Sequence, residues 1–409
     1  MTMLLHLTVL AAFLPTPGAA PTEVRVTGLG VALGPTPVLA EIDANSELKP
    51  GSYSLRAEGS NPLECEVYET NGKRWLAFVL DEIAAGQTRT FHVESVDHEK
   101  SAAGPGIRAE ITAEGALEIK ANGKAFTTLN QQPRKPYFYP VFGPGQRAFT
   151  RAYPMRDVEG EKHDHPHQRS LWFTHGDVNG FDFWGADPLN GANPRFGSIR
   201  QAGPPVIVAM GAVGVVRTRN RWLDPKGGSV CEDEREFRLW DLGNARVIDA
   251  VIRVHATDGP VKFGDTKEGT FGLRVPSSID VNRGEGGTIV NAEGLKDQNA
   301  WGKRSPWVDY SGPIEGQTGG IAILNHPSSF RFPTPWHVRD YGLFAANPFG
   351  NRDFGISEPG AYVLPKGETL TFAYRVILHQ GSASDAQIPA QFAAYSQPPM
   401  VEVVAETNP

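Results

Sequence analysis

Four histidines lie within thirteen residues of this chain, in the segment EKHDHPHQRSLWFTHGDVNGFDFWG: His163, His165, His167 and His175. The chain has only eleven histidines among its 409 residues, so this is a strong local excess. Imidazole titrates near neutral pH, and it can therefore pass protons or, when neutral, bind a metal. We infer that the stretch from His163 to Trp184 is the part of the chain best suited to chemistry or ligand binding.

Metal binding is the first interpretation of this segment. If His163, His165 and His167 lie on one extended stretch, alternation places all three on the same face, although Pro166 restricts such a stretch to an edge strand or a loop. Neutral imidazoles bind Zn, Cu and Fe, so these three histidines are the expected ligands if a metal is present. Their spacing matches no defined metal motif, and we therefore commit to no metal and leave the cofactor unknown.

General acid–base catalysis is the second interpretation. It needs imidazoles that carry protons and a carboxylate that shares the proton or orients a ring. The candidate carboxylates are Asp164, Asp177 and Asp182 nearby and Glu268 in the stretch DTKEGTFGLRV, and Glu268 is the one that we select. The catalytic candidates are His165, His167, His175, Glu268 and His337. The third interpretation is that these histidines are exposed loop residues or make ordinary hydrogen bonds in turns.

Aromatic and charged side chains gather in the same segment and in other loops rich in Gly and Pro. A Trp or Tyr ring stacks well on the C–H face of a sugar, while charged groups beside it bind the hydroxyls. We therefore expect a small-molecule or oligosaccharide substrate. The substrate-binding candidates are Tyr137, Tyr139, Arg147, Arg169, Trp172, Asp177, Trp184, Arg274, Lys303, Arg304, Trp307 and Trp336. The basic members would suit a uronic acid, and the alternative for each tryptophan is a place in the core.

The elements that must position these residues are strands. In Ala245–Ala256 and in Thr369–His379, apolar and polar residues alternate, which predicts strands with one buried face. Gly and Pro punctuate many further short β-branched and aromatic runs, and Asn122-Gly123 is a hairpin turn. Only Ser384–Ser396 has the pattern of a helix. We expect an all-β fold, with a small N-terminal β-sandwich-like domain followed by a large antiparallel β-supersandwich and few helices.

The termini and the length predict the domain organisation. An apolar run followed by Pro, Gly and Ala is typical of a secretory signal peptide, and it is too short to cross a membrane. A chain of this length exceeds one ordinary core, and a polar, glycine-containing stretch near residue 100 marks a boundary. We predict a signal peptide at 1–20, an N-terminal β domain at 21–104, a β-supersandwich domain carrying the site at 105–385, and a short helix and tail at 386–409. The mature protein is expected to be secreted or periplasmic, without a membrane span.

Charge, cysteines and missing motifs narrow the function classes. The net charge of -7, with both signs interspersed, argues against a nucleic-acid partner. Cys65 and Cys231 are the only cysteines, so they form at most one disulfide, and two buried thiols are an equal alternative. The chain has no G-x-S-x-G, G-x-x-x-x-G-K-[ST] or H-E-x-x-H motif, which argues against serine hydrolases, P-loop enzymes and zincins.

Five stretches resemble exported bacterial proteins often labelled PmoA-like, or methane oxygenase PmoA-like, whose function is poorly defined. They are KPYFYPVFGPGQRAFTRAYPMR, HDHPHQRSLWFTHGDVNGFDFW, DTKEGTFGLRV, DQNAWGKRSPWVDYSGP and PWHVRDYGLFAANPFG. The resemblance covers most of the mature chain, but Gln168 stands where a second consecutive His is common in the family. The family looks similar in fold to galactose-mutarotase-like supersandwich proteins, a fold shared by mutarotases, polysaccharide lyases and glycoside hydrolases.

A shared fold does not select a reaction, and the oxygenase label conflicts with the absence of membrane spans after the signal. The function that we predict is an exported carbohydrate-active enzyme that acts on a sugar ring or glycosidic bond by proton transfer between histidine and carboxylate. It would be a hydrolase, a lyase or an isomerase. The alternatives are a carbohydrate-binding protein without catalysis and a metal-dependent oxygenase-like protein, as the family label suggests.

Overall fold

The computed structural model describes residues 22–96, 105–131 and 133–405. The predicted signal peptide at 1–20 and the stretch around the predicted boundary at 104 lie outside the described residues. The described chain consists almost entirely of antiparallel strands, which confirms the all-β prediction. Its α-helix is α2, Ile388–Ser396, and its short 3-10 turns are η1 Pro144–Gln146, η2 Pro188–Asn190, η3 Ser277–Ile279, η4 Val281–Arg283 and η5 Asp297–Ala300.

Two large sheets form the body of the molecule. The nine-stranded sheet contains, in spatial order, β12 Ser198–Gln201, β14 Gly214–Leu223, β15 Ser229–Asp241, β16 Ala245–His255, β25 Thr369–Gln380, β21 Gln317–Asn325, β20 Trp307–Ile314 and β19 Thr288–Asn291, with β13 Val206–Ala209 beside β14. The eight-stranded sheet contains β22 Trp336–Val338, β23 Leu343–Ala346, β18 Gly269–Arg274, β11 Leu171–His175, β10 Tyr137–Val141, β9 Lys124–Asn130, β8 Leu117–Ala121 and β7 Ile107–Ile111. A separate pair is β17 Val261–Phe263 with β24 Tyr362–Leu364.

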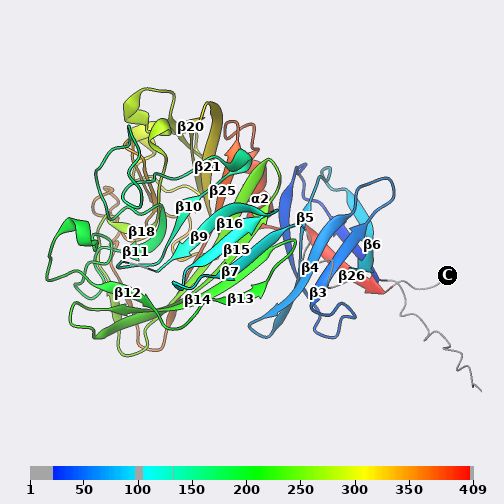
Figure 1. Ribbon diagram of the computed structural model, residues 1–409, viewed down its shortest axis with the longest axis horizontal. Coiled ribbons are helices and arrows are strands. Elements are labelled where there is room, and N and C mark those ends of the chain that lie inside the picture. The colour runs from blue at the N-terminus through cyan, green and yellow to red at the C-terminus, as the bar shows by residue number, and fades with distance from the viewer. Residues whose placement is uncertain (1–21, 97–104, 132, 406–409) are drawn as a thin grey trace, which may run out of the picture.

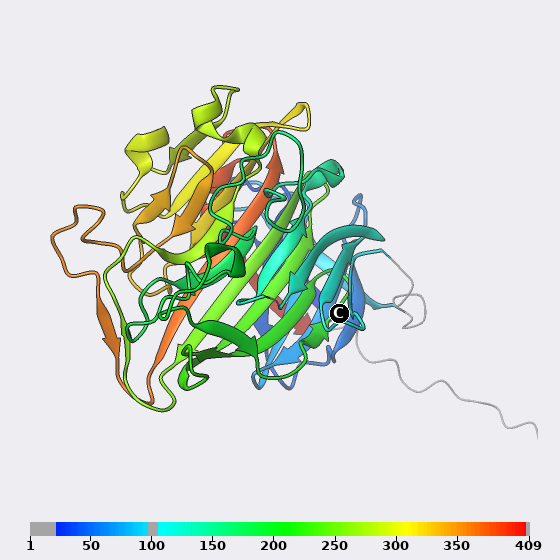
Figure 2. The same ribbon diagram turned by 60° about the vertical axis from the view of Figure 1, so that its left-hand side comes forward.

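The main hydrophobic core lies between these two sheets. Apolar side chains of β11 and β18, such as Phe173 and Phe271, meet those of β16 and β25, such as Ile252 and Phe372. Figure 2 shows the long strands of the nine-stranded sheet, from green to orange, crossing the body side by side. The arrangement is the stacked-sheet sandwich that the alternating pattern predicts.

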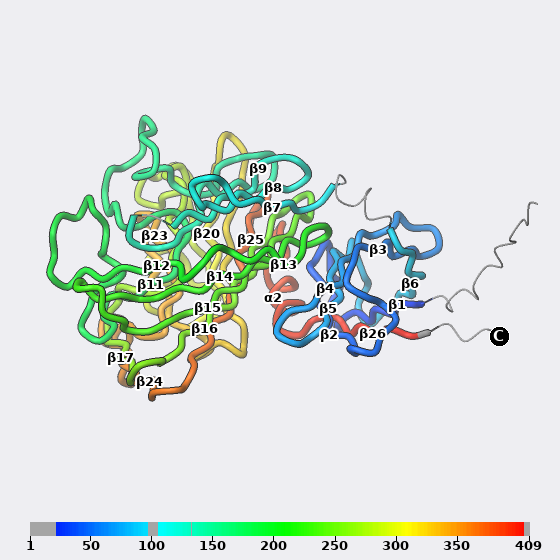
Figure 3. Tube along the Cα trace, turned by 60° about the horizontal axis from the view of Figure 1, so that its bottom comes forward, coloured from blue at the N-terminus to red at the C-terminus, as the bar shows by residue number. Residues whose placement is uncertain are grey.

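A third sheet packs against the nine-stranded one. It has seven strands in the order β2 Thr36–Ile42, β5 Lys73–Leu80, β4 Leu63–Thr70, β3 Gly51–Arg56, β6 Thr88–Ser95, β1 Thr22–Thr27 and β26 Met400–Ala405. Thus the C-terminal segment adds strand β26 beside β1 at the start of the chain. Figure 1 shows this sheet, blue with the red β26, at one end of the molecule, and Figure 3 shows α2 between it and the body.

This third sheet explains one difference from the sequence pattern. Strands β16 and β25 were expected to bury one face, yet Asp249 and Arg375 on the other face are also buried. The reason is that the seven-stranded sheet and α2 cover part of that face, with Trp240, Val247 and Ile377 in the interface. The two charges pair with each other, with Arg375 Nε 2.6 Å from Asp249 Oδ1.

Cys65 in β4 and Cys231 in β15 are both free and buried, so they are not bridged. Within the described residues, no helix is long and apolar enough to cross a membrane.

Candidate functional site

The outer face of the eight-stranded sheet, which points away from the main core, carries most of the predicted site residues. Along β11, Leu171 and Phe173 point into the core, so Trp172 points outward, where it packs in a separate cluster with Tyr137 of β10. Opposite Trp172 in β18 is Gly272, where a Cβ would lie 2.7 Å from the indole. A glycine is therefore required here for the ring to lie flat across the sheet.

We call six residues on this face and in the loops over it the outer-face cluster. They are His165, His167, Glu268, Arg274, His337 and Tyr341. Arg274 and His337 come from β18 and β22, Tyr341 from the turn before β23, and Glu268 immediately precedes β18. His165 and His167 come from the coil before β11.

An arginine–aspartate network holds that coil against the sheet. Asp164 Oδ1 accepts hydrogen bonds from Arg151 Nη1 at 2.5 Å and from Arg274 Nη2 at 3.0 Å. Arg274 Nη1 also donates to Gln168 Oε1. Burial alone would raise the pKa of Asp164, but its contact with His165 and the charges of Arg274 and Arg151 hold that pKa below its usual range. Asp164 is therefore an anion that fixes two buried guanidinium groups and the histidine-bearing coil.

His165 is positioned by stacking. Its ring lies parallel to that of Tyr341, with centroids 5.1 Å apart, and edge-on to that of His167, with centroids 5.8 Å apart. Its Nδ1 is 3.3 Å from Asp164 Oδ2, and its backbone has a positive φ of 45°. The Asp164 carboxylate thus helps to orient the His165 ring through Nδ1.

The neighbouring His167 has its tautomer fixed by Asn190. The amide nitrogen Nδ2 of Asn190 donates to the carbonyl oxygen of Gly185 at 2.7 Å, so it is the donor end of the amide, and it lies 3.0 Å from His167 Nδ1. His167 Nδ1 is thus the acceptor and Nε2 carries the hydrogen. Burial, with the charges of Lys135 and His165, lowers the pKa of His167 to about 3, so the ring is neutral near pH 7.

His337 has the opposite tautomer. Its Nδ1 lies 2.7 Å from the carbonyl oxygen of Lys267, which can only accept, so Nδ1 carries the hydrogen. Burial lowers the pKa of His337 to about 3. The side chain is buried, and no described residue forms a hydrogen bond with its Nε2. His337 therefore presents an unprotonated nitrogen.

Glu268 directly follows the residue that orients His337. Its carboxylate makes no hydrogen bond with any described side chain or backbone group, whereas its backbone oxygen accepts from Gly176 N at 2.7 Å. Burial raises the pKa of Glu268, while the positive charges of Lys267 and His165 partly oppose the shift. A carboxyl group with a raised pKa and no internal partner is suited to give or take a proton.

The tryptophans predicted to stack on a sugar are all buried. Trp172 and Trp184 pack under the site, where Lys135 Nζ donates to the carbonyl oxygen of Trp184 at 2.7 Å. Trp336 and Trp307 lie in the core and in the interface with the seven-stranded sheet. The alternative that these rings fill the core is therefore the one that the structure supports.

Several other predicted residues lie outside the cluster. His175 is fully buried on the core face of β11, against Phe263 and Phe349, so it does not open into one site with Glu268. Arg147 binds the carbonyl oxygens of Ile314 and Gln317.

Other charged candidates serve local structure or are exposed. Asp177 accepts from Gly180 N within its own turn, and Arg304 is an exposed residue that donates to Pro333 O. Lys303 is exposed on the same loop as Arg304. Arg169 belongs with the site but is already neutralised by Asp187, with Nε 2.5 Å from Oδ2. Tyr139 is half-buried on the outer face, next to Tyr137.

The three alternating histidines do not converge as a metal site would require. His163 stacks on Tyr153 and pairs with Asp157, and it is exposed, whereas His165 and His167 face the cluster. Within the described part of the chain, no three His, Cys, Asp or Glu side chains are arranged to hold one metal ion. The expected ligand set of His163, His165 and His167 is therefore not assembled.

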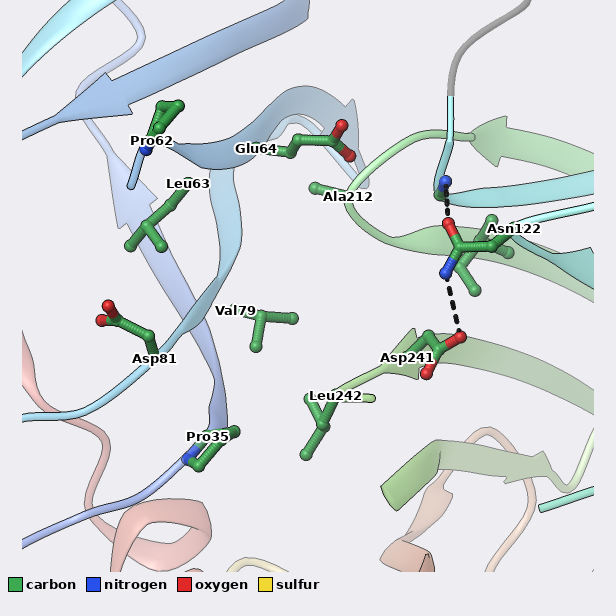
Figure 4. A pocket seen from close by; sticks show the side chains of 12 residues that line it. Pro35, Pro62, Leu63, Glu64, Val79, Asp81, Asn122, Ala212, Asp241 and Leu242 are labelled. Atoms are coloured by element: carbon green, nitrogen blue, oxygen red, sulfur yellow. Dashed lines mark hydrogen bonds between the residues drawn. The ribbon is translucent and has the colours of Figure 1, made fainter. Parts of the chain in front are cut away.

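A cleft of about 310 Å³ lies elsewhere, between the seven-stranded sheet and the body. Figure 4 shows its lining, where Asn122 donates to Asp241 at 3.1 Å and Leu63 and Asp81 stand opposite. None of the predicted site residues lines it.

Comparison with known proteins assigns a family. Residues 116–393 match a family described as one of unknown function, DUF6807. The chain belongs to the DUF6807 family. The whole outer-face cluster lies inside the region that matches DUF6807. Neither the family description nor the two solved structures described below carry the PmoA-like label, so the label rests on the sequence resemblance alone.

Structural similarity to solved proteins is distant. The DUF6807 chain is similar to a protein in the Glycosyl Hydrolase Family 38 from Enterococcus faecalis, with 10% identity and a TM-score of 0.39, over 95% of this chain and 48% of that one. It is also similar to a beta-arabinopyranosidase, with 12% identity and a TM-score of 0.28, over 67% of this chain and 38% of that one. The chain thus spans about half the length, or less, of these two proteins. No curated protein matches it.

Several residues that build the site in this DUF6807 protein escaped the sequence interpretation. They are Arg151, Asn190 and Tyr341, and Gln168 was noted only as a departure from the family motif. Asp164, between two of the selected histidines, was among the candidate carboxylates, although Glu268 was the one selected. Asn190 and Tyr341 lie far from the histidines in sequence, and only the fold places them there.

Proposed function

We propose that the outer-face cluster is the active site of an exported enzyme that transfers protons at a sugar ring or glycosidic bond. The observation that carries this proposal is the pair of neutral histidines with opposite tautomers. His337 presents a proton acceptor and His167 a hydrogen-bond donor. Glu268, with its raised pKa, supplies a carboxyl group that can hold the transferred proton.

The chemical step balances with these residues alone. His337 Nε2 accepts a proton from the anomeric hydroxyl in ring opening, from a ring carbon in elimination, or from the attacking water in hydrolysis. The C–O bond to the ring oxygen or leaving oxygen breaks, and that oxygen takes the proton of the Glu268 carboxyl group. The two groups return to their starting states when the product leaves or when water enters. Ring opening, elimination and hydrolysis share this exchange, so the arrangement suits an isomerase, a lyase or a hydrolase.

The surface of the cluster favours a sugar over an apolar ligand. His165 and Tyr341 form a stacked aromatic pair, and Tyr341 also lies against the guanidinium groups of Arg274 and Arg339. Stacking surfaces bordered by polar groups match the alternating C–H and hydroxyl faces of a pyranose. The buried tryptophans support this surface from below instead of contacting the ligand.

Product analysis tests the proposal. The purified protein is incubated with monosaccharides and oligosaccharides, including uronic and oxidised forms, and the products are identified by NMR and mass spectrometry. We expect His337→Gln and Glu268→Gln each to lower kcat by about 10²- to 10⁴-fold, the usual contribution of a general acid or base. Full activity in both variants would contradict the proposal.

The control substitution is His255→Gln. His255 lies in β16 of the nine-stranded sheet, where its Nδ1 contacts Thr369 Oγ1 at 2.9 Å, outside the cluster. It should leave turnover unchanged. Sugar binding without any turnover in the wild type would instead favour the carbohydrate-binding alternative.

A further inference from the structure

Three arginines at the outer-face cluster are already paired with carboxylates. Arg151 and Arg274 share Asp164, and Arg169 binds Asp187 through two hydrogen bonds. One carboxylate does not neutralise both Arg151 and Arg274, but these two side chains are buried and their Nη donors already bind Asp164, Gln168 and backbone oxygens. These three are therefore poor choices for binding a charged substrate.

Arg339 differs from them. Its guanidinium lies 5.5 Å from the ring centroid of Trp301 and 5.6 Å from that of Tyr341, within the range of cation–π contacts. It makes no ion pair or side-chain hydrogen bond with any described residue. The two rings thus hold the group in place while its N–H donors stay free.

The backbone aims Arg339 toward the proposed catalytic groups. It stands two residues after His337 at the end of β22, and its backbone N–H donates to Leu343 O at 2.7 Å, so the strand pairing continues through it. Residues two apart on a strand share a face and lie about 6.5 Å apart along it. This spacing corresponds roughly to the width of one pyranose ring.

The acid nearest to Arg339 in sequence is Asp340. Burial raises the pKa of its carboxyl group and the charge of Arg339 opposes that shift, but the two side chains form no ion pair. Asp353, on the other side, lies within electrostatic range of His337. Neither acid occupies the guanidinium, whose planar fork matches a carboxylate through two parallel hydrogen bonds.

We propose that the substrate is an acidic sugar whose carboxylate binds Arg339 while its ring faces His337, as in a uronic acid. The inference rests on the proposed function of the same cluster. It moves the expected carboxylate contact away from Arg169, Arg274, Lys303 and Arg304. The first two are paired, and the last two lie on an exposed loop with no contact to the cluster among the described residues.

Matched pairs of sugars test this assignment. Glucuronate and glucose, galacturonate and galactose, and their methyl glycosides are compared for binding by calorimetry and for turnover by NMR. A charge-assisted contact of this kind corresponds to about 10- to 100-fold in affinity, so we expect each uronate to bind more tightly than its neutral partner by that factor. Arg339→Gln should abolish the preference and leave the weak binding of the neutral sugars unchanged.

Two further variants separate a direct contact from a loss of packing. Arg339→Lys keeps the charge but not the planar fork, and should retain part of the preference. Arg219→Gln removes an exposed arginine of β14, paired with Glu234, and should change nothing.

The outcomes distinguish this inference from the proposed function. Turnover of neutral sugars with no preference for uronates would overturn the inference and leave the proposed function standing. Binding of uronates that depends on Arg339, without turnover of any sugar, would overturn the proposed function and keep the acidic ligand. If Arg339→Gln lost affinity for neutral and acidic sugars equally, the residue would only support the fold of the site, and the inference would be wrong.

Discussion

Asp164 should contribute strongly to stability, because it compensates two buried positive charges. The side chain of Arg151 is fully buried and that of Arg274 is 2% exposed, and both donate to the same carboxylate oxygen. Removing one partner of a buried ion pair costs about 3–5 kcal/mol, but the Asp164 side chain is 35% exposed, which screens part of the interaction. We therefore expect Asp164→Asn to lower the free energy of unfolding by about 2–3 kcal/mol.

The measurement is the melting temperature, by calorimetry, as a function of pH. For a chain of 409 residues, a loss of this size corresponds to a fall in Tm of about 2–4 °C at neutral pH. The folded-state pKa of Asp164 lies below its unfolded value, so its contribution is present above about pH 4 and is lost as the pH falls. The difference in Tm between the wild type and Asp164→Asn should therefore become smaller in acid, where residue 164 is neutral in both proteins.

The matched control is Asp157→Asn, which removes an aspartate that is 81% exposed and pairs with His163. Exposed ion pairs contribute about 0–1 kcal/mol, so this variant should melt close to the wild type. If Asp164→Asn were no less stable than Asp157→Asn, or if its difference from wild type did not narrow in acid, the role assigned to the arginine network would be wrong.

Three further predictions concern other groups. His379 Nε2 lies 2.7 Å from Oδ2 of buried Asp309. Burial disfavours the charged ring, but the aspartate outweighs it and raises the pKa of His379, so the ion pair stabilises the fold fully below about pH 6.5 and is lost as the pH rises further. The Tm deficit of His379→Gln relative to the wild type should therefore shrink from about pH 6 to about pH 9. Burial lowers the pKa of Lys135 to about 7, so between about pH 7 and 10 the unfolded chain holds a proton that the folded chain does not, and the wild type gains stability as the pH rises. Lys135→Met should lack this gain and show a flatter plot of Tm against pH. Asn190→Ala should release the tautomer of His167, and ¹⁵N NMR of the imidazole should then show a mixture in place of the Nε2–H form; an unchanged spectrum would contradict the assignment.

The sequence predicts the individual strands far better than it predicts how the sheets pack against one another. Alternation identified β16 and β25 and their core-facing residues, because a strand with a buried face has a period of two whatever its partners are. The second buried face of these strands was not predicted, because the seven-stranded sheet that covers it is distant in sequence. The pairing of β1 with β26 joins the two ends of the described chain, and no local pattern encodes such a contact.

For the candidate site, composition identified the region but not the role of each residue. His165 lies against His167 and Tyr341, Tyr341 lies against Arg274, and Glu268 is within electrostatic range of His165. His337 is on the same sheet, whose alternation turns it to the outer face. The same alternation excludes His175, which is the next residue after outward-facing Thr174 and so points into the core. Once β11 is recognised as a strand, counting three residues on from outward-facing Trp172 predicts that His175 points into the core.

The tryptophans show why residue type alone misassigns function. Trp172 and Trp184 were selected because tryptophan in a loop-rich segment is typical of a sugar site, yet both are buried beneath Lys135 and His167. Burial there has a consequence for the chemistry: the indoles exclude water below the cluster, and this desolvation keeps His167 neutral. The rings thus act on proton transfer by lowering a pKa, and a change such as Trp184→Ala would be expected to alter the pH profile of the site before it altered affinity for a sugar.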